Sequence, residues 1–234
     1  MPYYYSYWDP TYILVIIGVV ICMAASMKVK STFNKYAGVR AVSGLTGAEA
    51  AQKVLHAAGI FDVAVTKVAG DLTDHYDPRN KTLHLSESVY GSTSVAAIGV
   101  AAHECGHAIQ DAKSYAPLKI RGSLVPVANI GSKLSFPMIL LGIILGWVQP
   151  LITLGIVLFS VAVLFQLVTL PVEFNASSRA ITALGNSGIL YGEEIDSAKK
   201  VLSAAALTYV ASAASSVLQL LRLVLLYGNR RRDD

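Results

Sequence analysis

Charged side chains are scarce in this chain of 234 residues, because Asp, Glu, Lys and Arg together make up only 15% of it. Apolar residues make up 54%, and the mean hydropathy is +0.53. A soluble domain of ordinary composition carries about 25% charged residues. The shortage of charge therefore argues against an ordinary soluble domain and predicts a membrane protein.

Cysteine is rarer still, with Cys22 inside an apolar run and Cys105 inside a histidine motif. Two such cysteines do not make a disulfide framework, so we expect both to be reduced and structural. The chain also lacks an internal repeat and a low-complexity linker. This organisation leaves room for a few membrane helices and one modest polar domain.

The net charge of +4 does not indicate a nucleic-acid partner. Much of the positive charge flanks apolar segments, namely at Lys28, Lys30, Lys35 and Arg40 after the first apolar run and at Arg230 to Arg232 in the tail. Basic residues in such places orient membrane proteins. We therefore expect the lipid bilayer as a partner and no nucleic acid.

Residues 1–27 are predicted to form an aromatic N-terminus and a first transmembrane helix. The run from Tyr12 to Met27 is almost entirely apolar, and the aromatic residues before it are typical of a membrane interface. A cleaved signal peptide is the alternative, but the leading segment has no Lys or Arg and carries Asp9. Because the cationic flank follows the helix, we expect the N-terminus outside and residue 28 onward in the cytoplasm.

Residues 28–133 have the mixed composition of a small α+β domain. A capping box at Thr46–Glu49 predicts the start of a helix. Strands are predicted over residues 63–68 and 82–85, and the second could hold an extended substrate by edge pairing. Small apolar residues over 93–112 predict a tightly packed helix that ends in the histidine motif.

Residues 134–170 are predominantly apolar, too long for one crossing, and interrupted near the middle by Trp147 and Gln149-Pro150. We therefore predict a transmembrane hairpin that turns at Gln149-Pro150. Residues 171–234 should form a helix to Gly185 and a C-terminal helix with a basic tail.

The C-terminal stretch 201–227 carries a polar stripe at helical spacing. The stripe consists of Thr208, Ser212, Ser215, Ser216, Gln219 and Arg222. If this helix crossed the membrane, the arginines of the tail would lie outside, against the charge rule. We therefore expect a helix packed against the domain rather than a fourth span.

The run from His103 to His107, with the sequence His-Glu-Cys-Gly-His, carries the chemistry. Residues four apart on a helix project from one face, so His103 and His107 can hold one zinc ion. Glu104 is the predicted general base for a metal-bound water, and Cys105 faces the opposite side. So short a pattern can arise by chance, but two His and a Glu in an apolar helix are costly to bury without a metal. The sequence thus predicts one catalytic Zn²⁺.

A catalytic zinc ion usually has three protein ligands, and no further His follows within the next turns. Glu173 is the candidate, because a two-arm hairpin over 134–170 returns it to the side of the membrane that holds the two histidines. A single crossing would place it on the other side. The alternative role of Glu173 is an interfacial carboxylate paired with Arg179.

Four stretches carry a more specific likeness, namely Leu72-Thr-Asp-His-Tyr-Asp-Pro-Arg79, Leu83-His-Leu-Ser86, Ala101-Ala-His-Glu-Cys-Gly-His-Ala108 and Pro171-Val-Glu-Phe-Asn-Ala-Ser177. They resemble the YugP-like family of neutral zinc metallopeptidases, which are bacterial membrane proteins, and the likeness covers roughly residues 30 to 228. More distantly, the order of elements is similar to that of HtpX-like membrane peptidases. The resemblance implies a zincin-like domain of the gluzincin type, facing the cytoplasm from the plasma (inner) membrane of a bacterium.

Ser177 stands where the distant relatives often have an Asp that could orient a ligand histidine. Asp111, one turn beyond His107, is a candidate substitute, with an ordinary surface role as its alternative. Tyr209 is a candidate donor to an oxyanion. The remaining histidines are expected to be structural or surface residues, namely His56, His75 and His84.

The sequence therefore predicts a mainly α membrane protein with a small α+β catalytic domain that hydrolyses a peptide or protein substrate with zinc-activated water. One alternative is a non-catalytic membrane scaffold or quality-control partner in which zinc only stabilises the fold. Another is a small transporter, but that function would require ionisable residues within 134–170, and this segment has none.

Overall fold

A computed structural model describes residues 9–227. The predicted interfacial aromatics at residues 3–8 and the basic tail at 230–232 lie outside the described residues. The chain divides into two compact units. The helical unit consists of Met1–Ala25, Ile120–Val168 and Tyr209–Asp234, and the mixed unit consists of Ser26–Lys119 and Thr169–Thr208.

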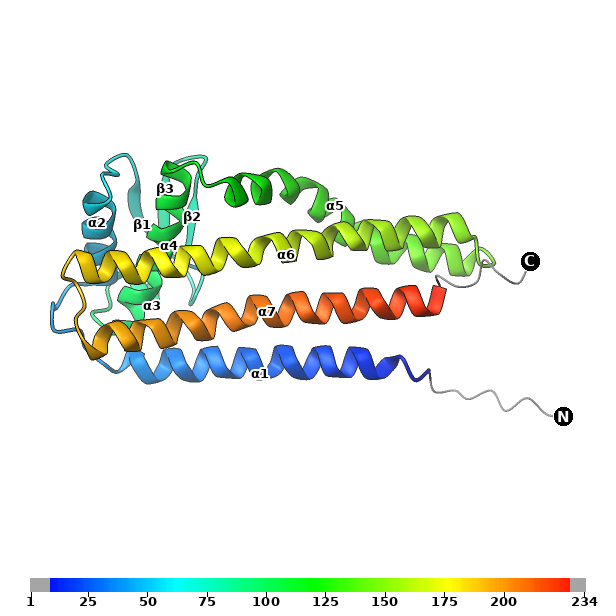
Figure 1. The fold of residues 1–234 in the computed structure, drawn as a ribbon, viewed down its shortest axis with the longest axis horizontal. Coiled ribbons are helices and arrows are strands. Elements are labelled where there is room, and N and C mark those ends of the chain that lie inside the picture. Colours follow the sequence, from blue (N-terminus) through cyan, green and yellow to red (C-terminus); the bar gives the residue numbers. More distant parts are fainter. Residues whose placement is uncertain (1–8, 228–234) are drawn as a thin grey trace. The chain divides into compact units, whose positions relative to one another are not determined.

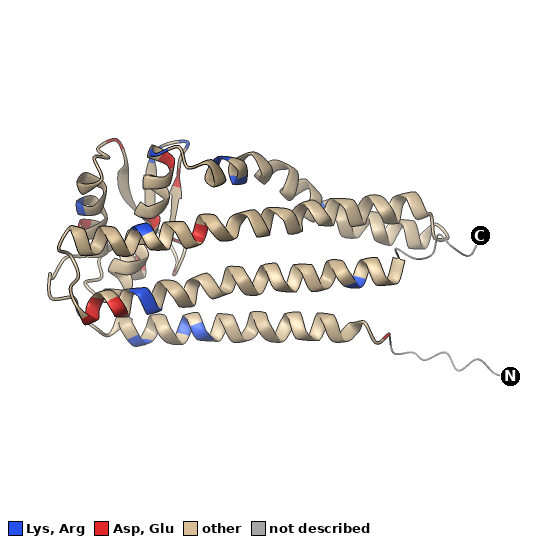
Figure 2. Ribbon diagram, in the orientation of Figure 1, with Lys and Arg blue, Asp and Glu red and all other residues tan. Residues whose placement is uncertain are grey.

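Four helices of the described chain are long and apolar enough to cross a membrane, namely α1 (Tyr12–Ala37), α5 (Ala116–Ile144), α6 (Gln149–Asn186) and α7 (Glu193–Tyr227). These four helices are labelled in Figure 1. Each contributes residues to both units. The described part of the helical unit carries few charges, and these are Asp9, Arg121, Lys133 and Arg222. The other charged residues of the described chain belong to the mixed unit (Figure 2). This distribution is the one expected of a membrane protein.

Helices α5 and α6 form the predicted hairpin, but its turn spans residues 145–148. Gln149-Pro150, predicted as the turn, instead begins α6, because proline fits the first turn of a helix. Glycines let the two helices approach closely: a Cβ atom at Gly155 would lie 2.7 Å from the Ser135 carbonyl oxygen. Both helices extend beyond the apolar run 134–170, and α6 continues through Pro171.

Residues 201–227, expected not to cross, belong to a helix that is long and apolar enough to do so. Within the helical unit, Arg222 of α7 donates to Asp9 at 3.1 Å. The Arg222 guanidinium also lies 4.3 Å from the centroid of the Tyr12 ring on α1. The charged member of the polar stripe is therefore neutralised within the helical unit.

Helix α2 (Gly47–Ala57) begins at the predicted capping box. Glu49 N donates to Thr46 Oγ1 at 3.2 Å, and Thr46 N donates to the Glu49 carboxylate at 2.8 Å. These two bonds satisfy donors that the first helical turn leaves unpaired. The sequence prediction for this helix start is confirmed.

The sheet of the mixed unit has three strands, β1 (Ala64–Val68), β2 (His75–Asp77) and β3 (Thr82–Ser86), in the order β1-β3-β2. Strand β3 pairs in parallel with β1 and antiparallel with β2. The two predicted strands are therefore confirmed, whereas β2 is too short to show a period. The expectation that residues 82–85 offer an edge to a substrate is wrong, because neighbours occupy both sides of β3.

Helix α4 (Val95–Ala112) forms the centre of the mixed unit, with α2, the short α3 (Glu87–Tyr90) and the sheet against it (Figure 1). Most of its side chains are buried. Its neighbours in the core include fully buried apolar residues of β3 and α6, such as Leu83, Leu85 and Leu184. The predicted tight packing of the histidine helix is confirmed, and it fixes the position of any group that α4 carries.

Candidate metal centre

Helix α4 holds two histidines next to each other in a nearly buried position. Ser94 caps its N-terminus by accepting a hydrogen bond from Ala97 N at 3.2 Å. His103 and His107 lie one turn apart, and their rings meet edge to face with centroids 4.9 Å apart. Their side chains are only 13% and 11% exposed. Two imidazoles are thus held together where little water reaches them.

A close contact between α4 and α6 brings Glu173 to this pair. A Cβ atom at Gly106 would collide with the carbonyl oxygen of Ala176, so a side chain at this position would push the helices apart. Glu173 lies one turn before Ala176 and is almost fully buried. Its Oε2 atom lies 3.3 Å from His103 Nε2 and 3.5 Å from His107 Nε2. The structure therefore brings together the three residues that the sequence predicts as metal ligands.

Two of the three separations between these donor atoms fit a tetrahedral zinc site. Zinc binds imidazole nitrogen and carboxylate oxygen at about 2.0–2.2 Å, so donors at two corners of a tetrahedron are about 3.4 Å apart. The two nitrogen-to-oxygen distances of 3.3 and 3.5 Å agree with that edge. Within residues 9–227, His103, His107 and Glu173 are the group of three His, Cys, Asp or Glu residues whose donor atoms lie close enough to share a metal ion.

Gln110 fixes the orientation of His107. Its amide nitrogen donates to Val172 O at 2.8 Å and to Asn175 Oδ1 at 3.0 Å. Its amide oxygen therefore faces the histidine, and lies 3.0 Å from His107 Nδ1. Because an amide oxygen only accepts hydrogen bonds, Nδ1 must donate, and the lone pair of a neutral His107 ring is then on Nε2, which faces Glu173.

Ser177 occupies the corresponding place beside His103. It lies one turn after Glu173 on α6, and its Oγ atom is 3.1 Å from His103 Nδ1. The structure thus places Ser177 beside His103 rather than His107. A hydroxyl group at this position can fix the orientation of the His103 ring, although it is a weaker acceptor than a carboxylate.

Glu104 follows His103 on α4 and is 8% exposed. No hydrogen bond or ion pair joins its carboxylate to another described residue. Because buried carboxylates normally have partners, the oxygens of Glu104 remain available to a water molecule or a substrate group. A general base must be able to form a hydrogen bond with the group whose proton it accepts.

The site carries a negative potential that favours a cation. Burial alone would lower the pKa of His107. The hydrogen bond to Glu173 and the negative charges of Glu104 and Glu173 raise this pKa instead. Two carboxylates beside two imidazoles thus make a suitable environment for a divalent metal ion.

Asp111 bonds to residues of the sheet region rather than to the histidines. Its Oδ2 atom accepts hydrogen bonds from Tyr76 Oη at 2.9 Å and from Lys81 Nζ at 2.7 Å. Burial alone would raise the pKa of Asp111, but these two bonds lower it. The role suggested for Asp111, orienting a ligand histidine, is filled by Gln110.

Other residues singled out in the sequence are not among the three donors of the metal centre. The Cys105 thiol is fully buried, lies 3.5 Å from Ala51 O, and has a pKa that burial raises, as expected of a packing residue. His56 packs on Phe61, and His75 stacks on His84. Tyr209 belongs to the helical unit, so its predicted role toward an oxyanion stays a prediction.

Sequence reasoning missed Gln110 and its partner Asn175. A signal for Gln110 was present, because it lies three residues after His107, on the same face of an otherwise apolar helix. Its side chain is fully buried, and a buried amide requires partners. Asn175 also accepts a hydrogen bond from Arg179 Nε at 2.7 Å. Arg179, suggested as an alternative partner of Glu173, thus has a role in this network.

Comparisons with known proteins identify the family of this chain. Residues 11–228 match the model of the family described as "Putative neutral zinc metallopeptidase". The "Putative membrane protease YugP" of Bacillus subtilis (strain 168) is 50% identical over 210 residues, which cover 90% of this chain and 93% of the relative. No solved structure matches the chain. The chain therefore belongs to the family that carries this description, as its sequence motifs predict.

Proposed function

We propose that this protein is an integral-membrane zinc metalloendopeptidase of the gluzincin type. In this proposal His103, His107 and Glu173 bind the metal and Glu104 is the general base. The observation that carries the proposal is the position of Glu173 Oε2, 3.3 and 3.5 Å from the two histidine Nε2 atoms. Membership of the family supports zinc as the metal.

Residues of this chain supply the remaining chemistry. When bound, zinc lowers the pKa of a water molecule and polarises a carbonyl group. Glu104 provides a carboxylate that can accept a proton from water and return it to the leaving amine. Gln110 and Ser177 hold the two imidazoles so that their Nε2 atoms stay directed toward Glu173.

A peptide or protein is the proposed substrate, and β2 is its proposed docking strand. Strand β2 lies at the edge of the sheet and contacts α4. An edge strand presents backbone donors and acceptors that an extended chain can pair with. Strand β2 thus takes the docking role that the sequence suggested for residues 82–85, because β3 has no free edge.

We propose that the mixed unit faces the cytoplasm from the bacterial plasma membrane, with the N-terminus outside. The two segments of this unit, Ser26–Lys119 and Thr169–Thr208, form one compact body and so lie on one side of the membrane. Helices α5 and α6 supply the two crossings that connect them. The lysines directly after the apolar part of α1 favour the cytoplasmic side.

Glu104→Gln in the purified full chain tests the mechanism. Its turnover of an unstructured protein such as labelled casein should fall by about 10²–10⁴-fold, the range of general base catalysis. Its zinc content should remain at one ion per chain. Glu87→Gln is the matched control, because Glu87 is an exposed carboxylate that pairs only with Lys67 at 3.3 Å among the described ion pairs.

The same experiment separates the peptidase from a scaffold. Unchanged turnover in Glu104→Gln would rule out the proposed mechanism. If instead the wild-type chain cleaves no unstructured substrate, and removal of zinc unfolds it, a non-catalytic zinc-stabilised scaffold becomes the better description.

A further inference from the structure

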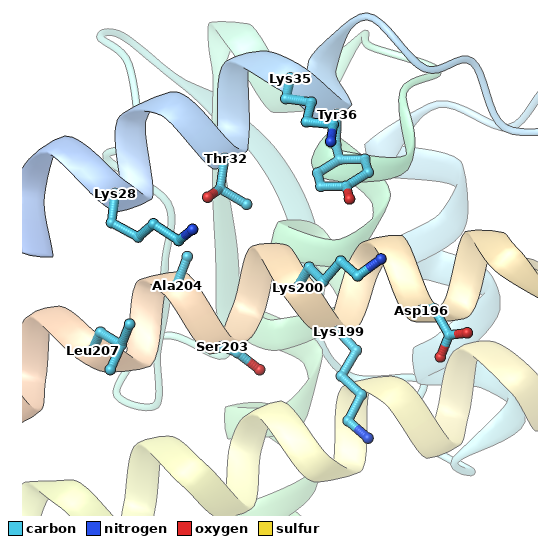
Figure 3. A pocket seen from close by; sticks show the side chains of 10 residues that line it. All are labelled: Lys28, Thr32, Lys35, Tyr36, Asp196, Lys199, Lys200, Ser203, Ala204 and Leu207. Carbon is cyan, nitrogen blue, oxygen red and sulfur yellow. The ribbon is translucent and has the colours of Figure 1, made fainter.

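A hollow of about 600 Å³ lies between α1 and α7 within the mixed unit (Figure 3). It shares no lining residue with the metal centre. Its residues on α1 occupy positions 28, 32, 35 and 36, and those on α7 recur every three or four positions from 196 to 207. Such spacing places each set on one face of its helix, so two facing helical surfaces form the hollow.

Lysines dominate this hollow. Lys28 and Lys35 come from α1, Lys199 and Lys200 come from α7, and Asp196 is the one acidic residue in the lining. None of the four ammonium groups forms an ion pair in the part of the chain that the structure describes. Lys35 Nζ lies 5.4 Å from the centroid of the Tyr36 ring, which leaves its charge without a carboxylate partner. Like charges gathered without carboxylate partners repel one another, and a bound anion reduces that repulsion.

Hydroxyl groups accompany the lysines. Thr32 and Tyr36 on α1 and Ser203 on α7 line the same hollow. In Figure 3, Lys28 points from α1 toward α7, and Lys200 extends from α7 toward Tyr36. Lys199 and Ser203 extend in this view from the side of α7 that faces away from α1 (Figure 3). The ammonium groups of Lys28 and Lys200, with the hydroxyl groups of Thr32 and Tyr36, are suitable donors for phosphate oxygens. The chemistry of the lining therefore indicates a phosphate-bearing ligand.

At one end of the hollow, the apolar side chains of Ala204 and Leu207 lie beside Lys28, and this end adjoins membrane segments in the sequence. Lys28 directly follows the apolar run 12–27, and Leu207 lies two residues before the part of α7 that belongs to the helical unit. Figure 3 shows Lys28, Ala204 and Leu207 together at this end. An anionic phospholipid has the matching layout, with acyl chains next to a charged phosphate.

We propose that this hollow binds the phosphate headgroup of an anionic phospholipid. Basic pockets between membrane helices bind such headgroups. The bound phosphate neutralises the lysines of α1 and α7 and links these two helices. The inference does not depend on peptidase activity, since it concerns different residues.

The test measures binding of phosphatidylglycerol to the full chain in detergent micelles by native mass spectrometry. Phosphatidylcholine is the zwitterionic comparison, and glycerol 3-phosphate represents the headgroup without a lipid. The pocket variant combines Lys28→Gln, Lys35→Gln and Lys200→Gln. The matched control removes the same charge from exposed lysines outside the hollow, with Lys30→Gln, Lys53→Gln and Lys67→Gln.

The wild-type chain should bind phosphatidylglycerol at least about tenfold more tightly than phosphatidylcholine. The affinity of the pocket variant for phosphatidylglycerol should be lower by on the order of 100-fold, and that of the control by less than about tenfold. A photoreactive phosphatidylglycerol should cross-link the wild-type chain within residues 28–36 and 196–207, a result that requires no variant to fold.

Three outcomes would overturn the inference. Equal losses in the pocket variant and the control would show a general surface attraction. Equal binding of both phospholipids would show that the phosphate charge is not recognised. Glycerol 3-phosphate binding as tightly as the lipid would identify a soluble ligand instead.

Discussion

Two pairs of histidines lie almost equally close within the mixed unit, yet only one pair belongs to a candidate metal centre. The ring centroids are 4.9 Å apart for His103 and His107 and 4.7 Å apart for His75 and His84. The helical pair meets at 84°, whereas the strand pair stacks at 25°. Imidazole lone pairs lie in the ring plane, so nearly parallel rings direct them side by side rather than toward one point.

The surroundings of the two pairs differ as well. The helical pair shares the Oε2 atom of Glu173 on another helix. In the strand pair, His84 contacts Thr66 Oγ1 and His75 contacts the Thr73 carbonyl oxygen, each at 2.9 Å. Close imidazoles therefore do not suffice for a metal site. Their lone pairs must converge, and an anionic third donor must face the same point.

The largest expected effect comes from breaking the helical pair. His107→Ala should weaken zinc binding by at least about 100-fold, because a binding free energy of about 10–16 kcal/mol is shared among few ligands. Isothermal titration and the zinc content of the purified chain measure this loss. His84→Ala in the strand pair is the control and should keep its zinc. Equal zinc loss in both variants would contradict the distinction between the pairs.

The third donor is tested by Glu173→Gln, which keeps the size of the side chain and removes its charge. We expect zinc affinity to fall by roughly 10- to 100-fold, since a neutral amide oxygen is a poorer zinc ligand than a carboxylate. Competition with a fluorescent zinc chelator measures the change. Glu193→Gln, at an exposed position in the first turn of α7, is the control. Undiminished zinc binding in Glu173→Gln would remove this residue from the site.

The group that orients the helical pair is tested by Gln110→Leu. Loss of the acceptor at His107 Nδ1 should lower zinc affinity by about tenfold, within the range known for partners of metal-bound histidine. The same titration measures it, with Gln52→Leu at an exposed position of α2 as the control. A melting curve of the zinc-free chain separates this effect from a loss of stability, because Gln110 also bonds Val172 O. Unchanged zinc affinity would show that Gln110 only supports the fold.

The smallest effects are expected at Ser177, where two substitutions should act in opposite directions. Ser177→Ala removes the contact with His103 Nδ1 and should weaken zinc binding by a factor of about five, the value of an ordinary hydrogen bond. Ser177→Asp provides a stronger acceptor and should tighten zinc binding by a similar factor. Parallel zinc titrations of both variants measure the order of their affinities. Tighter zinc binding by the alanine variant than by the aspartate variant would contradict the prediction.

Features that depend on neighbours in the sequence were predictable. The capping box at Thr46 joins residues three apart, and helix periodicity alone places His103 and His107 on one face. The location of Glu173 on the same side of the membrane as the two histidines was predictable, because the long apolar segment before it divides into two crossings. Each of these inferences uses local geometry or the thickness of a bilayer.

Features that depend on distant contacts were not predictable. The central position of β3 results from pairing with β2, whose three residues show no alternation. The partners of Asp111 come from β2 and the turn that follows it, and no local pattern indicates these contacts. Gln110 was missed because its partners, Val172 and Asn175, lie on another helix.

The sequence by itself determined the chemical class of the site, because a run of five residues on a buried helix fixes two imidazoles and a carboxylate at known spacing. Only the tertiary structure decided that Glu173 Oε2 faces both Nε2 atoms and that Gln110 and Ser177 hold the opposite ring nitrogens. Glu173 and His103 are 70 residues apart in the chain. Their meeting depends on the close contact of Gly106 with Ala176, which no local pattern specifies.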